Sequence, residues 1–293
     1  MESYTGFAEV YDTFMDNIPY RQWEERIKEQ LRRFGILPGN AAEDPVNDTA
    51  MDPVNDTAMD PANDEAEDPA QDALRQEHAL ICDLGCGTGT LTEMLSADGY
   101  EMIGIDLSEE MLEIAREKSA ESGSDILYLC QDMREFELYG TVGACISVCD
   151  SINYLLEERE VLQTFRLVNN YLYPGGIFLF DVNTPYKYRE VIGDATIAEN
   201  REECSFIWDN YYHEEEEINE YELTFFVKEG QLYRKFSEVH YQRGYDLATI
   251  QTLLLEAGLK FVFAIDAESG DTVRETTERI FVCAQEYMKE QHE

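Results

Sequence analysis

The sequence predicts an α/β fold built on a doubly wound, mostly parallel β-sheet, with an antiparallel β-rich insertion. Two observations lead to this fold class. Between about residues 79 and 182, short apolar runs alternate with helical patterns, which is typical of parallel strands joined by crossover helices. Between residues 203 and 243, helix signals are few and strand-like runs follow one another instead.

The expected elements follow the chain in order. Near the N-terminus, Ile27, Leu31 and Phe34 recur at helical spacing, so the sequence predicts a helix over about residues 21–34. The alternating part predicts strands over about 79–84, 101–105, 126–130, 142–148 and 176–182, and helices over about 89–97, 109–119 and 157–172. The remaining expected features are a hairpin turn at Glu229-Gly230, a helix over about 246–257, and strands over about 259–266 and 278–285.

An acidic repeat separates the N-terminal segment from the alternating part. From Asp44 on, the chain reads DPVNDTAM, DPVNDTAM, DPANDEAE and DPAQDALR, so an Asp-Pro step recurs every eight residues. Residues 43–72 hold eleven acidic residues and no basic one. Because such a segment buries little and repels itself, we expect a disordered insertion over 43–76. A calcium-binding repeat is the weaker interpretation, since the glycines that turn such loops are missing, and no metal site is expected.

The net charge limits the partners of the protein. The 293 residues include 22 Lys and Arg against 62 Asp and Glu, a net charge of −40, and setting aside the eleven acids of the repeat leaves −29. Such a surface repels phosphate backbones, so nucleic acid is not an expected partner. No apolar stretch approaches the ~20 residues of a membrane span, and the N-terminus lacks a signal pattern. We therefore expect a cytoplasmic protein without a membrane partner. No feature of the sequence predicts its oligomeric state.

A glycine-rich turn follows the first expected strand of the alternating part. It reads Asp83-Leu84-Gly85-Cys86-Gly87-Thr88-Gly89, and glycines at these positions let a ligand approach the backbone and the start of the next helix. Asp106 ends the second strand, where a carboxylate can accept hydrogen bonds from two ribose hydroxyls. Asp132 follows the third strand, where it can accept from an adenine amino group. A dinucleotide-binding fingerprint would require glycine at position 90, which is Thr90.

Together these motifs resemble those of class I S-adenosylmethionine-dependent methyltransferases. The resemblance covers residues 79–183 strongly and continues more loosely to 285. Its motifs are the glycine turn, Gly104-Ile105-Asp106-Leu107-Ser108 with Met111, Asp132-Met133, Cys149-Asp150-Ser151-Ile152-Asn153-Tyr154 and Leu172-Tyr173-Pro174-Gly175-Gly176. The start, Tyr4-Thr5-Gly6-Phe7-Ala8 with Tyr11-Asp12, and Asp181-Val182-Asn183-Thr184-Pro185 resemble a branch from Gram-positive bacteria that is similar to small-molecule methyltransferases with a β-rich lid.

The resemblance implies a Rossmann-like, seven-stranded sheet and a domain organisation. Residues 1–42 would form an N-terminal helical cover, 77–199 and 244–293 the methyltransferase core, and 200–243 a β-rich lid over the methyl acceptor. The implied cofactor is S-adenosylmethionine, which leaves as S-adenosylhomocysteine.

The resemblance also assigns cofactor contacts. The glycine turn, with Gly85, Cys86 and Gly87, would hold the methionine part beside the negative charge of Asp83. Asp106 would bind the ribose. The residues implied around the adenine are Leu107, Met111, Asp132 and Met133. Cys149 would line the methionine side, and the aromatic residues of the cover would be Tyr4, Tyr11, Tyr20 and Trp23.

Methyl transfer from a sulfonium requires alignment of the reactants more than a dedicated catalytic group. A base is needed only when the acceptor arrives protonated. His213 is the histidine chosen for that role, with His240 as the other candidate of the β-rich segment, and Asn153 and Tyr154 can contact the acceptor. Surface exposure, helix capping or ordinary packing is the alternative explanation for each.

The expected function is therefore methyl transfer to a small-molecule acceptor. An RNA or protein methyltransferase is one alternative, although the charge disfavours RNA. A sensor that binds S-adenosylmethionine without turnover is the other.

Overall fold

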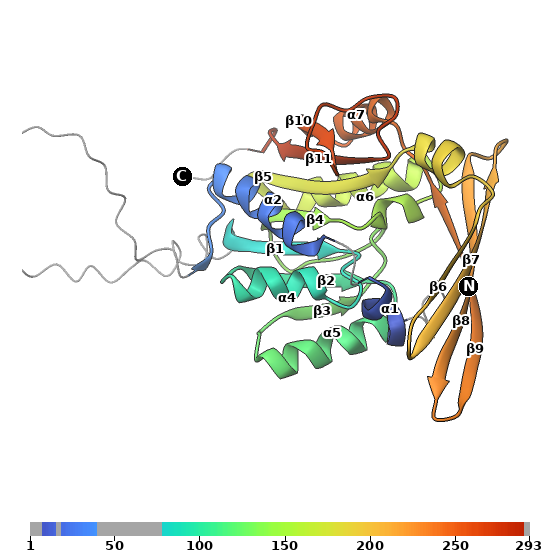
Figure 1. Ribbon diagram of the computed structural model, residues 1–293. Coiled ribbons are helices and arrows are strands. Elements are labelled where there is room, and N and C mark those ends of the chain that lie inside the picture. Colours follow the sequence, from blue (N-terminus) through green and yellow to red (C-terminus); the bar gives the residue numbers. More distant parts are fainter. Residues whose placement is uncertain (1–7, 16–18, 40–77, 290–293) are drawn as a thin grey trace, which may run out of the picture.

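The structure is a computed structural model that describes residues 8–15, 19–39 and 78–289 (Figure 1). The acidic insertion expected at 43–76 and Tyr4 of the N-terminal cover lie outside the described residues. Within the described part, no helix combines the length and apolar character needed to cross a membrane.

The main sheet has seven strands in the order β10-β11-β5-β4-β1-β2-β3. Neighbours among β1 to β5 run parallel, while β11 is antiparallel to both β5 and β10. The predicted doubly wound, mostly parallel sheet is therefore confirmed. The strands are β1 (Leu80–Leu84), β2 (Glu101–Asp106), β3 (Leu127–Cys130), β4 (Val142–Ser147), β5 (Leu172–Asn183), β10 (Leu259–Asp266) and β11 (Arg279–Glu286).

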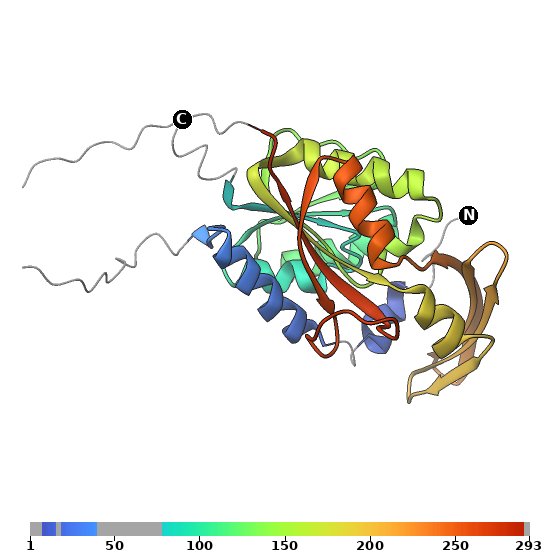
Figure 2. The same ribbon diagram turned by 90° about the horizontal axis from the view of Figure 1, so that it is seen from above.

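Helices cover both faces of this sheet. One face carries α2 (Tyr20–Arg33), α4 (Thr90–Ala97) and α5 (Glu109–Ser122). The other carries α6 (Glu158–Tyr171) and α7 (Leu247–Glu256), as the view in Figure 2 shows. Parallel strands buried on both faces are expected to be apolar throughout, and β4 is indeed buried at every position.

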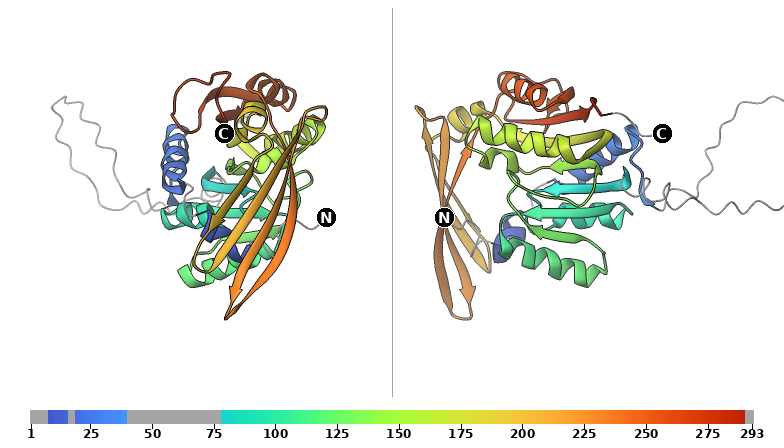
Figure 3. Two further views of the ribbon diagram at one scale, coloured as in Figure 1. Left: turned by 45° about the vertical axis from the view of Figure 1, so that its right-hand side comes forward. Right: turned by 180° about the vertical axis from the view of Figure 1, so that it is seen from behind.

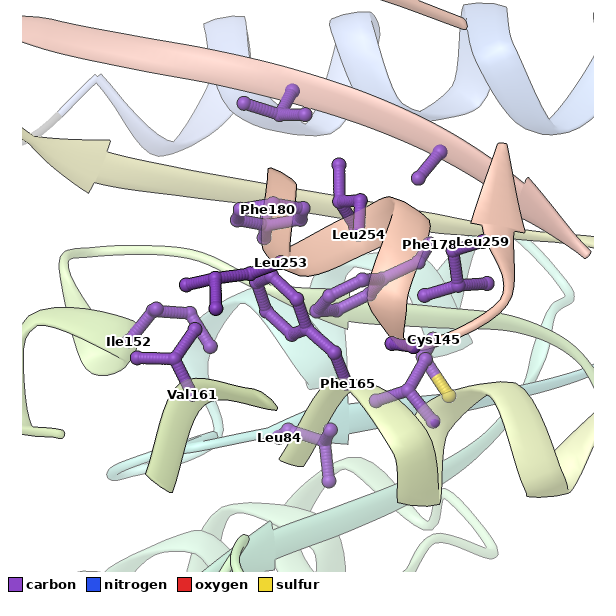
Figure 4. Close-up of a cluster of buried hydrophobic side chains, with 14 of the residues drawn as sticks. Leu84, Cys145, Ile152, Val161, Phe165, Phe178, Phe180, Leu253, Leu254 and Leu259 are labelled. Carbon is purple, nitrogen blue, oxygen red and sulfur yellow. The ribbon is translucent and has the colours of Figure 1, made fainter. Parts of the chain in front are cut away.

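The core beneath α6 and α7 is rich in aromatic side chains (Figure 4). Phe178 and Phe180 point to this face of β5 because they are two residues apart, and their rings stack at 4.5 Å between centroids. Phe165 of α6 packs on both rings. Leu254 of α7 is buried in the same cluster. The apolar residues at helical spacing in α6 and α7 thus pack in one core with the apolar residues at alternate positions of β5.

A second, antiparallel sheet lies across the carboxyl ends of the parallel strands (Figures 1 and 3). Its strands are β6 (Thr196–Asn200), β7 (Cys204–His213), β8 (Ile218–Glu229) and β9 (Leu232–Arg243). The sheet begins at Thr196, four residues before the expected segment 200–243. β8 and β9 pair along their whole length around the predicted Glu229-Gly230 turn, where Gly230 has a φ of +65°. We call these four strands the β6–β9 sheet.

The β6–β9 sheet packs against α1 (Ala8–Phe14), a seven-residue helix within the expected N-terminal helical cover, for which the sequence predicted no separate bounds. Phe14 meets Phe206 edge-on at 4.8 Å between ring centroids, and Val10 and Phe14 share a buried cluster with Leu223 and Phe225. A helix this short is not stable alone, so tertiary packing stabilises α1.

The structure predicts how two neighbouring leucines of α7 differ in their effect on stability. Leu254 is 0% exposed and Leu255 is 67% exposed. Leu254→Ala should lower the free energy of unfolding by about 2–5 kcal/mol through lost burial and a cavity. Leu255→Ala should change it by less than about 0.5 kcal/mol. Urea denaturation of the full chain measures both, and equal losses would contradict this assignment of the core.

Candidate cofactor site

A cavity of about 610 Å³ opens at the carboxyl edge of the parallel sheet. It lies where β1 neighbours β2 on one side and β4 on the other, which is where the strand order reverses. Open α/β sheets bind ligands at this position. The residues predicted for the cofactor or acceptor that line the cavity are Tyr11, Tyr20, Asp83, Gly85, Cys86, Gly87, Asp106, Leu107, Met111, Asp132, Met133, Cys149 and Tyr154.

The glycine turn exposes its backbone to the cavity. Gly85 has a φ of +76°, and a Cβ there would lie 2.5 Å from Ser151 Oγ, so a larger side chain does not fit. The Ser151 hydroxyl donates to the Gly85 carbonyl at 3.2 Å. Ser151 was not among the predicted site residues, although its motif was recognised. The hydrogen bond links the turn after β1 to η2 (Ser151–Tyr154), the 3₁₀ turn after β4.

Asp106 joins two neighbouring loops at the site. Its Oδ2 accepts from the Gly87 amide at 2.8 Å and its Oδ1 from the Ser108 amide at 2.9 Å. These bonds fix the orientation of the Asp106 carboxylate, and Asp106 lines the cavity. Burial nevertheless raises the pKa of Asp106 above its ordinary range, because an ion in this position is poorly solvated. Donation from a ligand's hydroxyls would stabilise the charged form.

Asp83 is buried at the end of β1 and accepts a hydrogen bond from Thr92 Oγ1 at 2.7 Å. Burial raises the pKa of Asp83 to about 7, with a smaller contribution from the negative charge of Asp106. A carboxyl group with this pKa is partly protonated at neutral pH. Its ionised form would be favoured by a cation placed beside it.

The side of the cavity formed by the segments that follow β2 and β3 is partly apolar. Met111 is buried in the first turn of α5, whose N-terminus is capped by the Ser108 hydroxyl at 3.2 Å from the Met111 amide. Leu107 is 67% exposed, so its side chain offers a surface that a flat ring can cover. The Asp132 carboxylate binds Arg134, which lowers its pKa. Asp132 is therefore charged and already paired.

Asp12 links the N-terminal helix α1 to the glycine turn and to α5. Its carboxylate accepts from Thr88 Oγ1 at 2.6 Å and pairs with Lys118 Nζ of α5 at 2.6 Å. Tyr11 and Tyr20 line the cavity, and burial raises the pKa of both phenols. The sequence contained Tyr11-Asp12 as part of a motif, but periodicity in a seven-residue helix could not reveal the role of Asp12.

Three predicted site residues do not line the cavity. Trp23 lies on the inward face of α2 and packs on Phe281 of β11 at 5.9 Å between ring centroids. Asn153 is buried, because its side chain bonds the backbone of Asn183 and the Arg243 carbonyl. His213 is exposed on β7 and pairs with Glu220 at 2.7 Å. In the folded chain these three side chains therefore pack or form hydrogen bonds outside the cavity.

Strained backbone and buried charge lie beside the cavity. Cys149 and Asp150 have φ values of +60° and +58°, an arrangement that costs energy in residues other than glycine and clusters at functional sites. Arg279 holds this turn by pairing with Asp150 at 2.8 Å and with Asp181 at 2.7 Å. Burial raises the pKa of Asp181 to about 6. The sequence identified Asp150 and Asp181 only as parts of motifs, because Arg279 is far away along the chain.

The donors and acceptors present fit S-adenosylmethionine. The cavity combines an oriented carboxylate for ribose hydroxyls, an apolar wall for a purine and a buried acid beside an open backbone turn. Its volume is within the range of about 300–1,000 Å³ that small-molecule sites occupy. The individual contacts remain predictions.

Comparison with known proteins agrees with this geometry. Residues 81–176 match a family described as "Methyltransferase domain". A crystal structure of a S-adenosylmethionine-dependent methyltransferase from Clostridium acetobutylicum ATCC 824 superimposes with a TM-score of 0.76 at 25% identity, covering 96% of this chain and 98% of that one. The fold of CalS10 from Micromonospora echinaspora, solved with S-adenosylmethionine bound, is also similar, with a TM-score of 0.56 at 21% identity over 74% of this chain and 89% of that one. Fold and site thus define a class I S-adenosylmethionine-dependent methyltransferase.

The relatives place the chain more narrowly. It is 34% identical over 284 residues to "Putative methyltransferase YqeM" of Bacillus subtilis (strain 168), covering 96% of each chain. A second relative, from Geobacillus sp. (strain WCH70), is also 34% identical and is covered over 99% of its length. The chain belongs to this methyltransferase family, and the predicted resemblance and cofactor are confirmed.

Removing the Asp106 carboxylate should weaken cofactor binding. Two hydrogen bonds to a charged acceptor, each contributing about 1.5–3 kcal/mol, correspond to a loss of roughly 100-fold or more in affinity for Asp106→Ala. Calorimetric titration with S-adenosylhomocysteine measures this loss. Asp125→Ala is the control, because Asp125 is exposed ahead of β3 at the opposite edge of the sheet. Undiminished affinity in Asp106→Ala would refute the ribose contact.

The pKa of Asp83 should make this affinity depend on pH. The ammonium group of the ligand favours ionised Asp83, so binding below pH ~7 requires loss of a proton. Affinity should rise up to tenfold per pH unit as the pH approaches 7 and level off above it. Asp83→Asn should flatten this dependence. A wild-type affinity that is constant from pH 5.5 to 8 would contradict the assignment.

Proposed function

We propose that this methyltransferase acts on a small-molecule acceptor, which binds where the cofactor cavity reaches Tyr154 and Leu155. The size of the cavity at the carboxyl edge of the sheet, about 610 Å³, carries this proposal. An acceptor that must enter a cavity of this size, bordered by Tyr11 of α1, is more easily a small molecule than a folded macromolecule. The net charge of −40 further disfavours nucleic acid.

The chain's main contribution to catalysis is alignment. The bound cofactor supplies an electrophilic methyl group on a sulfonium. Asp106 would orient the ribose, and the Gly85–Gly87 turn with Asp83 would hold the methionine part. Tyr11 and Tyr20 would exclude water from above. Placing the reactants in line can account for about 7–11 kcal/mol of barrier lowering without a covalent intermediate.

The β6–β9 sheet serves as the lid of the acceptor side in this proposal. Among the described residues its side chains do not line the cavity itself. Instead they pack on α1 and on the outer side of η2, where the Tyr154 hydroxyl lies 2.8 Å from that of Tyr221. The lid would therefore shape the acceptor site through Tyr154.

A more distant relative supports the small-molecule assignment. The dTDP-3-amino-3,4,6-trideoxy-alpha-D-glucopyranose N,N-dimethyltransferase of Streptomyces venezuelae is 27% identical over 198 residues, which is 66% of this chain and 81% of that protein. Its name describes methylation of an amino group on a nucleotide-linked sugar. We include such amino sugars among the candidate acceptors.

The proposal predicts release of S-adenosylhomocysteine in the presence of a suitable small molecule. The panel comprises amines, amino sugars, phenols, carboxylates and thiols, with bulk tRNA and a protein lysate as macromolecular arms. Asp106→Ala is the inactive control. Turnover with tRNA or protein alone would refute the small-molecule assignment. Tight cofactor binding without turnover in any arm would indicate a sensor instead.

A further inference from the structure

Four polar side chains, two of them buried, form a cluster behind the proposed acceptor end of the cavity. They are Tyr154 of η2, Tyr221 of β8, and Glu238 and His240 of β9, and we call them the Tyr154–His240 cluster. Tyr154 Oη lies 2.8 Å from Tyr221 Oη and 3.3 Å from His240 Nδ1. The His240 ring stacks on that of Tyr221 at 5.1 Å and an interplanar angle of 11°. Tyr154 is the member that lines the cavity.

The strand register explains why these residues meet. Tyr221 pairs directly with His240, and Leu223 pairs with Glu238. Tyr221, Glu238 and His240 therefore point to the same face of the β6–β9 sheet. That face is turned toward α1 and η2. His240 is 1% exposed and Glu238 is 8% exposed. Burying an imidazole and a carboxylate is costly unless they are paired, so this placement calls for an explanation.

Neighbouring groups favour one arrangement of protons. His240 Nε2 lies 3.4 Å from Glu238 Oε2, which is within ion-pair distance but does not form a hydrogen bond. The nearby negative charge favours a proton on Nε2, which leaves Nδ1 as an acceptor. Tyr154 can then donate to Nδ1 while Tyr221 donates to Tyr154. Burial raises the pKa of Tyr221, and the negative charge of Asp150 adds to this. The other titratable group nearby is Tyr188, whose pKa burial also raises.

We propose that the Tyr154–His240 cluster is a proton relay that accepts a proton from an N–H or O–H methyl acceptor. Tyr154 contacts the acceptor, and His240 and Glu238 act through it as positioning residues. The proposal rests on the proposed function and specifies its acceptor class. It excludes acceptors without a dissociable proton, such as thioethers and tertiary amines.

The relay balances in charge and atoms. The acceptor proton moves to the Tyr154 oxygen as the Tyr154 proton moves to His240 Nδ1. The acceptor atom keeps an electron pair and forms its bond to the methyl carbon, while the electrons of the broken carbon–sulfur bond stay on sulfur. The positive charge that leaves sulfur is replaced by that of the imidazolium, which lies beside the Glu238 carboxylate.

Ligand binding tests this placement without a known acceptor. Sinefungin carries an amine-bearing carbon in place of the methylated sulfur, so its ammonium group would meet Tyr154. We expect the full chain to bind sinefungin more tightly than S-adenosylhomocysteine by calorimetry. Tyr154→Phe should reduce this preference by about tenfold, the value of one charge-assisted hydrogen bond, and leave the affinity for S-adenosylhomocysteine unchanged. Ser237→Ala is the control, because Ser237 is exposed and adjacent residues of a strand face opposite sides.

Substitutions at His240 test its part in positioning Tyr154. His240 Nδ1 lies 3.3 Å from Tyr154 Oη, so His240→Ala should remove the acceptor that orients the hydroxyl and lower the preference for sinefungin. His240→Gln, whose side-chain oxygen can again accept from Tyr154, should restore part of the preference, which a purely structural role would not predict. The affinity for S-adenosylhomocysteine should stay unchanged in both variants.

An unchanged preference in Tyr154→Phe, or equal losses of preference in His240→Ala and His240→Gln, would overturn the relay. Neither result depends on turnover. Failure of the acceptor panel would therefore count against the proposed function alone.

Discussion

The hydrogen bonds from the Gly87 and Ser108 amides to the Asp106 carboxylate are the interaction on which the site depends. They join the turn after β1 to the start of α5 after β2, two segments that meet because parallel strands end at one edge of a sheet. The same contacts fix the orientation of the Asp106 carboxylate, and Asp106 lines the cavity. Burial of Asp106 disfavours its charge, so the site is electrostatically prepared for a ligand that donates hydrogen bonds.

Segments from distant parts of the chain enclose this edge. Asp12 fastens α1 to the glycine turn and α5, while Phe14 on the same helix packs on the β6–β9 sheet. On the other side, Arg279 pairs with Asp150 and Asp181 and so stabilises the strained turn after β4. These contacts hold α1 and the turn after β4 beside the cavity at the carboxyl edge of the sheet. In the proposed function, this enclosure aligns the reactants and excludes water.

The repeating patterns of the sequence predicted most of the fold because they reflect local burial. The helices α2, α6 and α7 lie within a residue or two of their expected bounds, since each has one apolar face for the core. The bounds of helix α1 were not predicted because a seven-residue segment has too few turns to show that period. The Pro174-Gly175-Gly176 segment was expected to precede a strand, yet it lies within β5. The pairing of β5 with β4 shifts register there, which accommodates the segment. Local composition does not show how a segment pairs with a neighbouring strand, so this part of β5 was not predicted.

The sequence motifs suffice to identify the class of protein and to predict which residues line the cofactor cavity. Glycines and acids at fixed distances from strand ends have defined positions once the strands are parallel, so Gly85, Asp83 and Asp106 could be placed by counting residues. Which side chains are available to the proposed acceptor depends on how distant segments of the chain pack together. Asn153 is used by backbone carbonyls and His213 faces solvent, whereas His240 is brought to Tyr154 from 86 residues away. The register of the β6–β9 sheet places His240 on the face that is turned toward Tyr154. Because adjacent residues of a strand face opposite sides, sequence spacing alone does not show which histidine is buried.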